Sequence, residues 1–336
     1  MLQSCESTLA TAFDVALVDL DGVAYRGPEP IPFAAESLGD ARAAGMGLVF
    51  VTNNASREPE TVAEHLTTLG IPTGPDEVMT AAQAAAAVLA GRLQPGARVL
   101  VVGGAGLVTA VRGAGFEVVS SADDEPVAVV QGFAPEVGWT QLAEAAYAVQ
   151  RGAWYVVSNL DRTLPNERGI APGNGSLVGV VRAATGVEPV SAGKPEPTMF
   201  TLAAQRRGAA RPLVVGDRLD TDLGGARAAG MPGLHVLTGV SSARDAVLAV
   251  PGERPAFLGA DLRSLHVSHA APVPEDGWWA CGGAAATVRD GRLELRDDAT
   301  GDPLDVARAA CAAVWSAQDD GRAVDPATVP ELAPMG

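Results

Sequence analysis

Two aspartates, Asp19 and Asp21, come directly after the apolar residues 15–18 and are followed by Gly22. A short apolar run that stops at acids and a glycine is typical of a buried parallel strand whose carboxyl end reaches a site. If the strand continued through Asp21, both carboxylates would point into the crevice where open α/β sheets bind ligands. Because like charges at this spacing require a cation or a proton, the pair predicts metal or acid–base chemistry. A plain Asp-Gly turn is the alternative.

A second apolar segment, residues 47–51, ends in Thr52, Asn53 and Asn54. These residues offer a hydroxyl, side-chain amides and backbone N–H groups at the end of a predicted strand. Donors of this kind suit the oxygens of a phosphate as charge develops on them.

Lys194 is the only lysine among the 24 basic residues of the chain, and it lies between Gly193 and Pro195. A lysine supplies a compact point charge where an arginine would impose a planar fork. A further strand, residues 213–215, precedes Asp217, and Asp222 follows five residues later. Carboxylates are the ligands that a hard divalent cation prefers.

In this order the segments resemble the four motifs of the haloacid dehalogenase superfamily. The closest likeness is to the branch of nitrophenylphosphatases, phosphoglycolate and glycerol phosphate phosphatases, and sugar or nucleotide phosphatases. The cap of this branch is inserted between the second and third motifs and carries an Asn-x-Asp and a Pro-Gly-x-Gly segment. Here these are Asn159-Leu160-Asp161 and Pro172-Gly173-Asn174-Gly175. The resemblance covers roughly residues 13–265.

The resemblance implies an α/β fold with a Rossmann-like core and a parallel sheet. We expect the core domain to comprise residues 1–80 and 188–265, and an inserted α/β cap domain to comprise residues 81–187. Alternating apolar strands and helical stretches from residue 15 onward favour the same βαβ organisation. Within it we expect helices over residues 32–44, from a start signal at Ser56 to Gly70, over 76–93 and over 219–229.

The resemblance also implies a role for each motif residue. Asp19 is the expected nucleophile, which forms an aspartyl phosphate, and Asp21 the expected general acid and base. Lys194 and Mg2+ are expected to offset the charge of the attacked phosphate. By the resemblance, Asp21 favours a phosphatase or a mutase, because transport ATPases of the superfamily have threonine there and dehalogenases lack the acid. The type of cap resembles that of hydrolases, which favours a phosphatase over a mutase.

The implied metal ligands are Asp19 and Asp217 through their carboxylates, Asp21 through its backbone carbonyl and Asp222 through water. The residues expected to bind the phosphate or the rest of the substrate are Gly22, Thr52, Asn53, Asn54, Asn159, Asp161 and Lys194. Arg162 and Arg168 either contact the substrate or face solvent.

The overall charge and the cysteines limit the classes of partner. A net charge of -16 and a pI near 4.6 argue against nucleic acid or an anionic membrane as partner. The three cysteines, Cys5, Cys281 and Cys311, are too few and too widely spaced to imply a disulfide framework or a zinc cluster. No apolar run approaches 18 residues, so we expect a cytoplasmic protein. Caps in this branch often make dimers, which leaves a homodimer open.

Residues 266–336 change in character and lie outside the resemblance. Residues 278–281 and 293–295, separated by an Asp-Gly turn, predict a hairpin, and residues 305–317 predict an amphipathic helix. For His266 and His269, a solvated turn is favoured over a metal site. Because a β-β-α unit of this size buries little apolar surface alone, this small α+β extension is expected to pack on the phosphatase body or on another subunit.

The sequence therefore predicts a Mg2+-dependent phosphomonoester hydrolase, EC class 3.1.3, that acts on a small phosphorylated metabolite. Glycerol 3-phosphate and 2-phosphoglycolate are the favoured substrates. A sugar or nucleotide phosphatase of the same branch is one alternative. A non-catalytic regulator that binds a phosphorylated metabolite is another.

Overall fold

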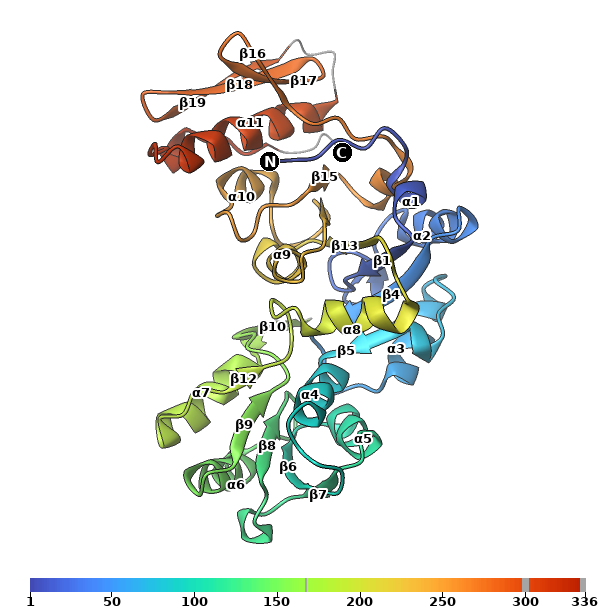
Figure 1. The fold of residues 1–336 in the computed structure, drawn as a ribbon, viewed down its shortest axis with the longest axis vertical. Coiled ribbons are helices and arrows are strands. Elements are labelled where there is room, and N and C mark those ends of the chain that lie inside the picture. The colour runs from blue at the N-terminus through green and yellow to red at the C-terminus, as the bar shows by residue number, and fades with distance from the viewer. Residues whose placement is uncertain (167, 298–301, 333–336) are drawn as a thin grey trace. The chain divides into compact units, whose positions relative to one another are not determined.

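The computed structural model describes residues 1–166, 168–297 and 302–332 (Figure 1). The chain divides into two compact units, of which the first combines residues 1–49 with 204–336 and the second comprises residues 50–203. The boundary falls inside strand β4 (Gly47–Thr52) and inside helix α8 (Thr198–Arg207).

The first unit is built on a parallel sheet in the order β15-β14-β13-β1-β4. Besides β4, its strands are β1 (Val15–Val18), β13 (Pro212–Gly216), β14 (Gly233–Val236) and β15 (Phe257–Gly259). All four residues of β1 are buried, as expected for a strand with neighbours on both sides and helices on both faces. Since the strands are parallel, the residues that follow β1 and β13 leave the sheet at the same edge.

The helical segments of the first unit are mostly short. Apart from α8 and the C-terminal residues, they are α1 (Leu9–Ala12), α2 (Ala34–Ala43), the π-helical turn η3 (Leu219–Leu223), α9 (Gly224–Ala228), α10 (Ala243–Leu248) and η4 (Leu262–His266). The helix predicted over residues 32–44 is confirmed as α2. The helix predicted over 219–229 is η3 continued by α9.

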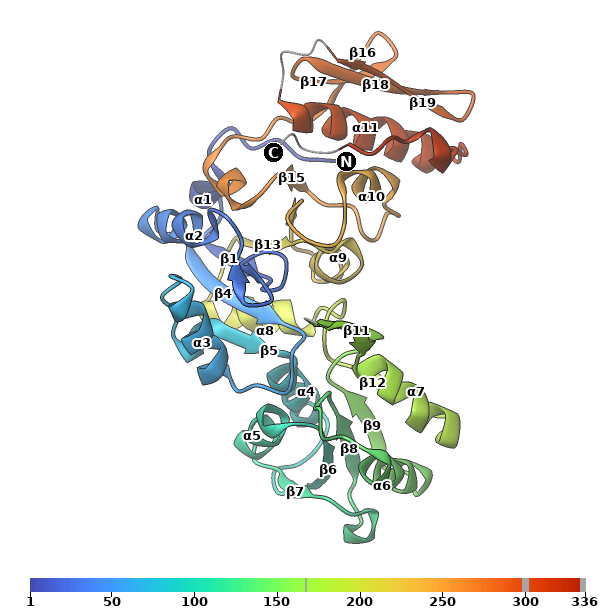
Figure 2. The same ribbon diagram turned by 180° about the vertical axis from the view of Figure 1, so that it is seen from behind.

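The second unit holds a five-stranded parallel sheet in the order β12-β9-β8-β6-β7. Its strands are β6 (Arg98–Val102), β7 (Glu117–Val119), β8 (Ala128–Gln131), β9 (Trp154–Val157) and β12 (Val190–Ser191). Its helical segments are α3 (Pro59–Thr68), η1 (Pro75–Glu77), α4 (Ala81–Ala90), α5 (Ala105–Gly113), η2 (Ala122–Asp124), α6 (Trp139–Gln150) and α7 (Asn174–Thr185). A hairpin of β10 (Thr163–Asn166) and β11 (Gly169–Pro172) precedes α7 (Figure 2).

The helix predicted over residues 76–93 is wrong at its start. Residues 78–80 form strand β5 (Val78–Thr80), which pairs in parallel with Phe50, Val51 and Thr52 of β4. The alanine-rich stretch begins its helix only afterwards, where the Thr80 hydroxyl accepts a hydrogen bond from the Gln83 N–H at 3.3 Å. Val78 and Thr80 are β-branched residues that favour a strand, and pairing with β4 completes that strand ahead of the alanine-rich helix.

The C-terminal residues form a four-stranded antiparallel sheet and one long helix. The strands are β16 (Val273–Glu275), β17 (Trp278–Cys281), β18 (Ala284–Arg289) and β19 (Arg292–Asp297), and the helix is α11 (Pro303–Asp319), followed by η5 (Pro326–Thr328). The Asp-Gly turn joins β18 to β19, so the predicted pairing of residues 278–281 with 293–295 is wrong. Strand β18 is not predicted by the local pattern, because the three alanines with which it begins carry little strand signal. We call residues 273–297 and 302–332 the C-terminal module.

The module shares a hydrophobic core with the rest of the first unit. Trp315 of α11 is fully buried, and its cluster includes Leu223 of η3, Val247 of α10 and Leu258 of β15. In Figure 1 and Figure 2, α11 lies beside α10. The expectation that this extension packs on the rest of the chain is confirmed.

The segment between β15 and the module is not the solvated turn that the sequence favoured. His269 is only 4% exposed, and its Nε2 lies 2.8 Å from the Ser264 carbonyl oxygen. His266 Nε2 lies 2.9 Å from the Ser37 carbonyl oxygen. Both imidazoles thus have backbone partners, which spacing alone does not reveal.

The fold class predicted from the sequence, α/β with parallel sheets and an α+β C-terminal extension, is confirmed. Among the described residues, no helix combines the length and the apolar character needed to cross a membrane.

Candidate active site

Three carboxylates of the first unit gather at the carboxyl ends of β1 and β13. Asp19, Asp217 and Asp222 each offer an oxygen within 4.8 Å of the others. Their exposed fractions are 9%, 0% and 1%, so the charges are held largely out of water. We call these residues the acid cluster. Buried like charges at this distance repel strongly, and a cation is the natural relief.

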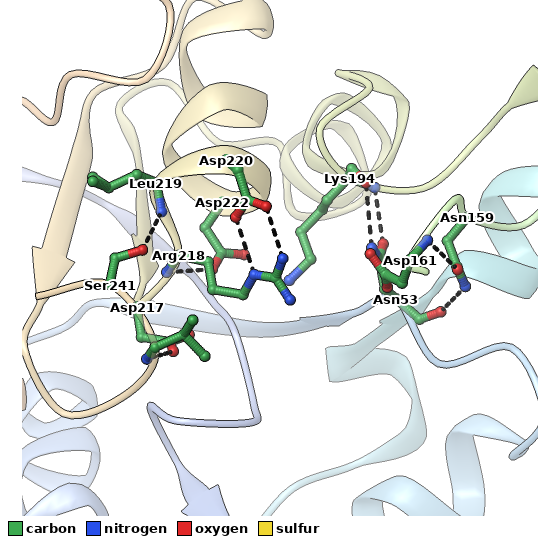
Figure 3. A network of polar contacts seen from close by, with 11 residues as sticks. Asn53, Asn159, Asp161, Lys194, Asp217, Arg218, Leu219, Asp220, Asp222 and Ser241 are labelled. Carbon is green, nitrogen blue, oxygen red and sulfur yellow. Dashed lines mark hydrogen bonds and ion pairs between the residues drawn. The ribbon is translucent and has the colours of Figure 1, made fainter. Parts of the chain in front are cut away.

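The backbone holds each member of the cluster in place. The Asp19 N–H donates to the Val215 carbonyl at 2.8 Å, which extends the β1–β13 ladder by one residue. Asp217 Oδ2 accepts from the Val240 N–H at 2.7 Å. Asp222 Oδ2 accepts from the Arg218 N–H at 3.2 Å (Figure 3).

Asp21 lies outside this cluster. Strand β1 ends at Val18, so the condition that Asp19 and Asp21 share one strand face is not met. Asp21 instead is exposed and forms an isolated bridge with Tyr25, and the Gly22 N–H donates to the Tyr25 carbonyl at 2.8 Å. The Gly22 N–H, which we expected to bind phosphate, is therefore used within this turn.

Two neighbours of the acid cluster are the Arg218–Asp220 ion pair and His235. Arg218 donates to both oxygens of Asp220, at 3.0 and 2.7 Å. Burial acts to raise the pKa of Asp220, but these hydrogen bonds outweigh it and lower that pKa. Burial lowers the pKa of His235, on β14, to about 4, so its imidazole is neutral at pH 7. Neither group adds net charge to the acid cluster.

A second polar network lies in the second unit (Figure 3). Asn53 Oδ1 accepts from the Lys194 N–H at 2.8 Å, and Asn53 Nδ2 donates to Asp161 Oδ2 at 3.0 Å. Asn159 Nδ2 donates to the Asn53 carbonyl at 2.8 Å, and Asn159 Oδ1 accepts from the Asp161 N–H at 3.1 Å. We call Asn53, Asn159, Asp161 and Lys194 the lysine–asparagine network. It joins residues 53, 159–161 and 194, which are distant in the sequence.

Lys194 is buried, with 4% of its surface exposed, and its Nζ donates to the Val51 carbonyl at 3.2 Å. This bond places the ammonium group at the end of β4. Thr52, also buried, accepts the Asn54 N–H at 3.1 Å on its hydroxyl. The Asn54 side-chain oxygen accepts from the Ser56 N–H at 2.8 Å, so it shapes the turn before α3.

The predicted site residues are thus brought together in two groups, one in each unit. Asp19, Asp217 and Asp222 form the first, and Asn53, Asn159, Asp161 and Lys194 form the second. Sequence reasoning missed residues 238–242, which follow β14 and contact Asp217. Their Thr-Gly-Val-Ser-Ser composition at the carboxyl end of a parallel strand was an available signal.

The arrangement defines a class of protein before any comparison. The acid cluster consists only of buried carboxylates at the carboxyl edge of a parallel sheet. Carboxylate oxygens are the ligands that a hard divalent cation prefers. Such a cation beside a carboxylate nucleophile suits phosphoryl transfer.

Comparison with known proteins agrees with this class. The haloacid dehalogenase-like hydrolase family profile matches residues 16–117, and a HAD-hydrolase-like profile matches residues 191–265. A profile of a GCN5-related N-acetyltransferase-like domain matches residues 281–333.

Characterised relatives cover most of the chain. D-glycerol 3-phosphate phosphatase of Mycobacterium tuberculosis is 48% identical over 318 residues, which is 93% of this chain and 88% of the relative. Acid sugar phosphatase of Staphylococcus aureus is 39% identical over 231 residues, which is 68% of this chain and 88% of the relative. The chain therefore belongs to the haloacid dehalogenase-like hydrolases, and it is a phosphatase.

Solved structures resemble the chain in three dimensions. The crystal structure of glycerol phosphate phosphatase from M. tuberculosis in complex with magnesium has a TM-score of 0.86 and 46% identity, and the match covers 93% of both chains. A thermostable phosphatase (NPPase) from Geobacillus stearothermophilus has a TM-score of 0.68 at 32% identity, over 74% of this chain and 96% of that one.

Proposed function

We propose that this phosphatase hydrolyses glycerol 3-phosphate, with Mg2+ as its cofactor and Asp19 as its nucleophile. The observation that carries the proposal is the acid cluster, whose three carboxylate oxygens lie within 4.8 Å of one another. The names of the M. tuberculosis relatives, one of them in complex with magnesium, support the substrate and the metal.

The residues of the acid cluster fit Mg2+. All three donors are carboxylate oxygens, without the sulfur or imidazole ligands that softer metals select. We propose that Asp19 and Asp217 bind the ion directly and Asp222 through water, with the Asp21 carbonyl as a further ligand. When bound, Mg2+ neutralises part of the negative charge that nucleophile and phosphate bring together.

The chemistry then belongs to the chain's own carboxylates. An oxygen of Asp19 attacks phosphorus, and the bond from phosphorus to the substrate alkoxide breaks as Asp21 donates its proton to that oxygen. Asp21, now ionised, accepts a proton from water, whose oxygen attacks the aspartyl phosphate and releases inorganic phosphate and Asp19. The exposed position of Asp21 in a turn after β1 lets it reach solvent water.

Lys194 and the end of β4 supply the groups that bind the negatively charged phosphate. We propose that the Lys194 ammonium group and the Thr52 hydroxyl bind the non-bridging phosphate oxygens. The lysine–asparagine network supports this role, because Asn53 fixes the backbone of Lys194 and Asn159 fixes the backbone of Asn53. Residues 81–187 then act as a cap, with Asp161 near the substrate.

The experiment is a phosphate-release screen of the purified chain with Mg2+. Glycerol 3-phosphate, 2-phosphoglycolate, sugar phosphates, nucleoside monophosphates and pyridoxal phosphate are ranked by kcat/KM. We expect glycerol 3-phosphate to rank first. A higher rank for sugar phosphates would favour the acid sugar phosphatase relative, which is the second candidate.

The alternative of a non-catalytic regulator predicts that the chain binds a phosphorylated metabolite without releasing phosphate. Calorimetry on the same substrates separates binding from turnover. The cytoplasmic location and the homodimer stay predictions, which cell fractionation and light scattering test.

A further inference from the structure

We propose that residues 238–242 position the metal ligand Asp217, and that the C-terminal module holds these residues in place through α10. The module then belongs to the metal site of the phosphatase. This inference rests on the proposed function in taking the acid cluster as the Mg2+ site.

Residues 238–242, which we call the 238–242 loop, bind Asp217 at two points. The Val240 N–H donates to Asp217 Oδ2 at 2.7 Å, and the Ser241 N–H donates to the Asp217 carbonyl at 3.1 Å. The Ser241 hydroxyl also accepts from the Leu219 N–H at 3.2 Å, which ties the loop to the start of η3. One carboxylate oxygen of Asp217 is thereby oriented by the loop.

The same loop is joined to the segment that follows β1. The Thr238 hydroxyl donates to the Gly22 carbonyl at 2.5 Å, and Arg26 donates to the Thr238 carbonyl. Since Gly22 follows Asp21, the loop connects the stretch containing Asp19 and Asp21 with the stretch containing Asp217. A shift of the loop would therefore change the spacing of the metal ligands.

Contacts between the loop and Asp217 leave no space for a side chain. A Cβ added to Gly239 would lie 1.8 Å from Asp217 Oδ2, and one added to Gly22 would lie 2.5 Å from the same oxygen. Glycine at both positions lets the two backbones enclose this carboxylate. Such close packing fixes the carboxylate only while the loop itself stays in place.

Helix α10 anchors the loop. Ser242 caps the helix, because its side-chain oxygen accepts from the Asp245 N–H at 3.1 Å while Asp245 Oδ2 accepts from the Ser242 N–H at 2.8 Å. The first residues of the helix thus continue directly from the loop. Ala243, Ala246 and Val247 are buried, so the helix is positioned by what packs on it.

The C-terminal module supplies that packing. Trp315 Nε1 donates to the Ala246 carbonyl at 3.1 Å, within the shared core of α10 and α11. Arg244 donates to the carbonyls of Val329 and Pro326, at 2.9 and 2.8 Å. Residues Glu331 and Leu332 line a cavity of about 230 Å³ together with Gly239, Val240 and Ser241. The module therefore contacts the helix and lines one cavity together with the loop.

Calorimetric titration of the full-length chain with Mg2+ in the absence of substrate tests the proposal. Thr238→Val removes the hydroxyl but keeps the shape, and we expect Mg2+ affinity to fall about tenfold, as for other groups that orient metal ligands. Thr238→Ser keeps the hydroxyl and should restore affinity to within about twofold of the original chain. Wild-type affinity in Thr238→Val would overturn the role of the loop.

The role of the module is tested by Trp315→Phe, which removes the indole N–H in the core behind α10. We expect Mg2+ affinity to fall about threefold or more. Leu142→Ala, in the core of the second unit, controls for a general loss of stability and should leave Mg2+ affinity unchanged. Equal affinities in Trp315→Phe and the original chain would overturn the role of the module.

These measurements remain separate from the proposed function. If the variants lose Mg2+ affinity but the original chain releases phosphate from no substrate, the proposed activity is wrong and the positioning stands. If the chain is an active phosphatase and all variants bind Mg2+ alike, the positioning is wrong and the activity stands.

Discussion

The acid cluster and the lysine–asparagine network solve opposite electrostatic problems. The cluster brings together three buried groups of one charge, held by backbone N–H groups of residues such as Val240 and Arg218. The network brings together amides, a carboxylate and an ammonium group, which hydrogen-bond to one another and to the backbone. The first therefore needs an external cation to be favourable, whereas the second is a structural unit as it stands. The following predictions test this difference.

The largest expected effect is the loss of turnover in Asp19→Asn. The amide cannot act as a nucleophile, so we expect phosphate release to fall by about four orders of magnitude or more. Asp220→Asn is the matched control, because Asp220 is paired with Arg218 outside the acid cluster. Its kcat should stay within about threefold of the original value. If kcat fell equally in both variants, the assignment of the nucleophile to Asp19 rather than to any nearby acid would be wrong.

Gly239→Ala should have the next largest effect. Its Cβ would lie 1.8 Å from Asp217 Oδ2, so either the loop or the metal ligand must move. We expect Mg2+ affinity, measured by calorimetry, to fall about a hundredfold. Gly39→Ala in α2 is the control, since a Cβ there meets nothing within 4 Å and alanine favours a helix. Retained Mg2+ affinity in Gly239→Ala would contradict the close packing around Asp217.

Asn159→Ala tests the lysine–asparagine network. It removes the donor to the Asn53 carbonyl and the acceptor of the Asp161 N–H, which leaves buried groups without these partners. We expect a loss of about 2 kcal/mol in the free energy of unfolding, measured with urea, and a higher KM. Mg2+ affinity should not change, and the exposed Gln94→Ala should change neither property. A loss of Mg2+ affinity would mean that the two groups depend on each other.

The smallest expected effect is the stabilisation by Mg2+ itself. Mg2+ at 10 times Kd adds about 1.4 kcal/mol to stability, because it binds the acid cluster of the folded chain and not the unfolded chain. Thermal unfolding with Mg2+ and with EDTA measures this shift. Asn159→Ala should retain the full shift, whereas Gly239→Ala should lose most of it. A shift that is absent from the original chain would contradict the idea that the cluster needs a cation.

Much of the fold was predictable from local pattern. The strands before Asp19 and Asp217 are both recognisable in the sequence as apolar runs that stop near an acid. Because the two strands pair in parallel, their carboxyl ends lie at one edge of the sheet. Strand β5 and strand β18 were not predictable in this way. Strand β5 is only three residues long and runs directly into an alanine-rich helix, and β18 begins with three alanines, so the pairing with a neighbouring strand decides both.

The candidate site divides along the same line. Its acids, its lysine and its asparagines are distinctive residue types at strand ends, so they could be named from the sequence. The 238–242 loop could not, because its contribution comes mainly from backbone N–H groups and from the absence of a Cβ at Gly239. Those features depend on where the backbone runs and not on side-chain chemistry.

The amino-acid sequence by itself determined the family, the α/β class and the residues of the acid cluster, because strand patterns and reactive side chains can be recognised in short segments of the sequence. Only the tertiary structure decided which backbone encloses Asp217 and that Trp315 packs on α10, the helix that continues from that backbone. The physical reason is that hydrogen bonds and packing between distant segments depend on chain paths that no local pattern specifies.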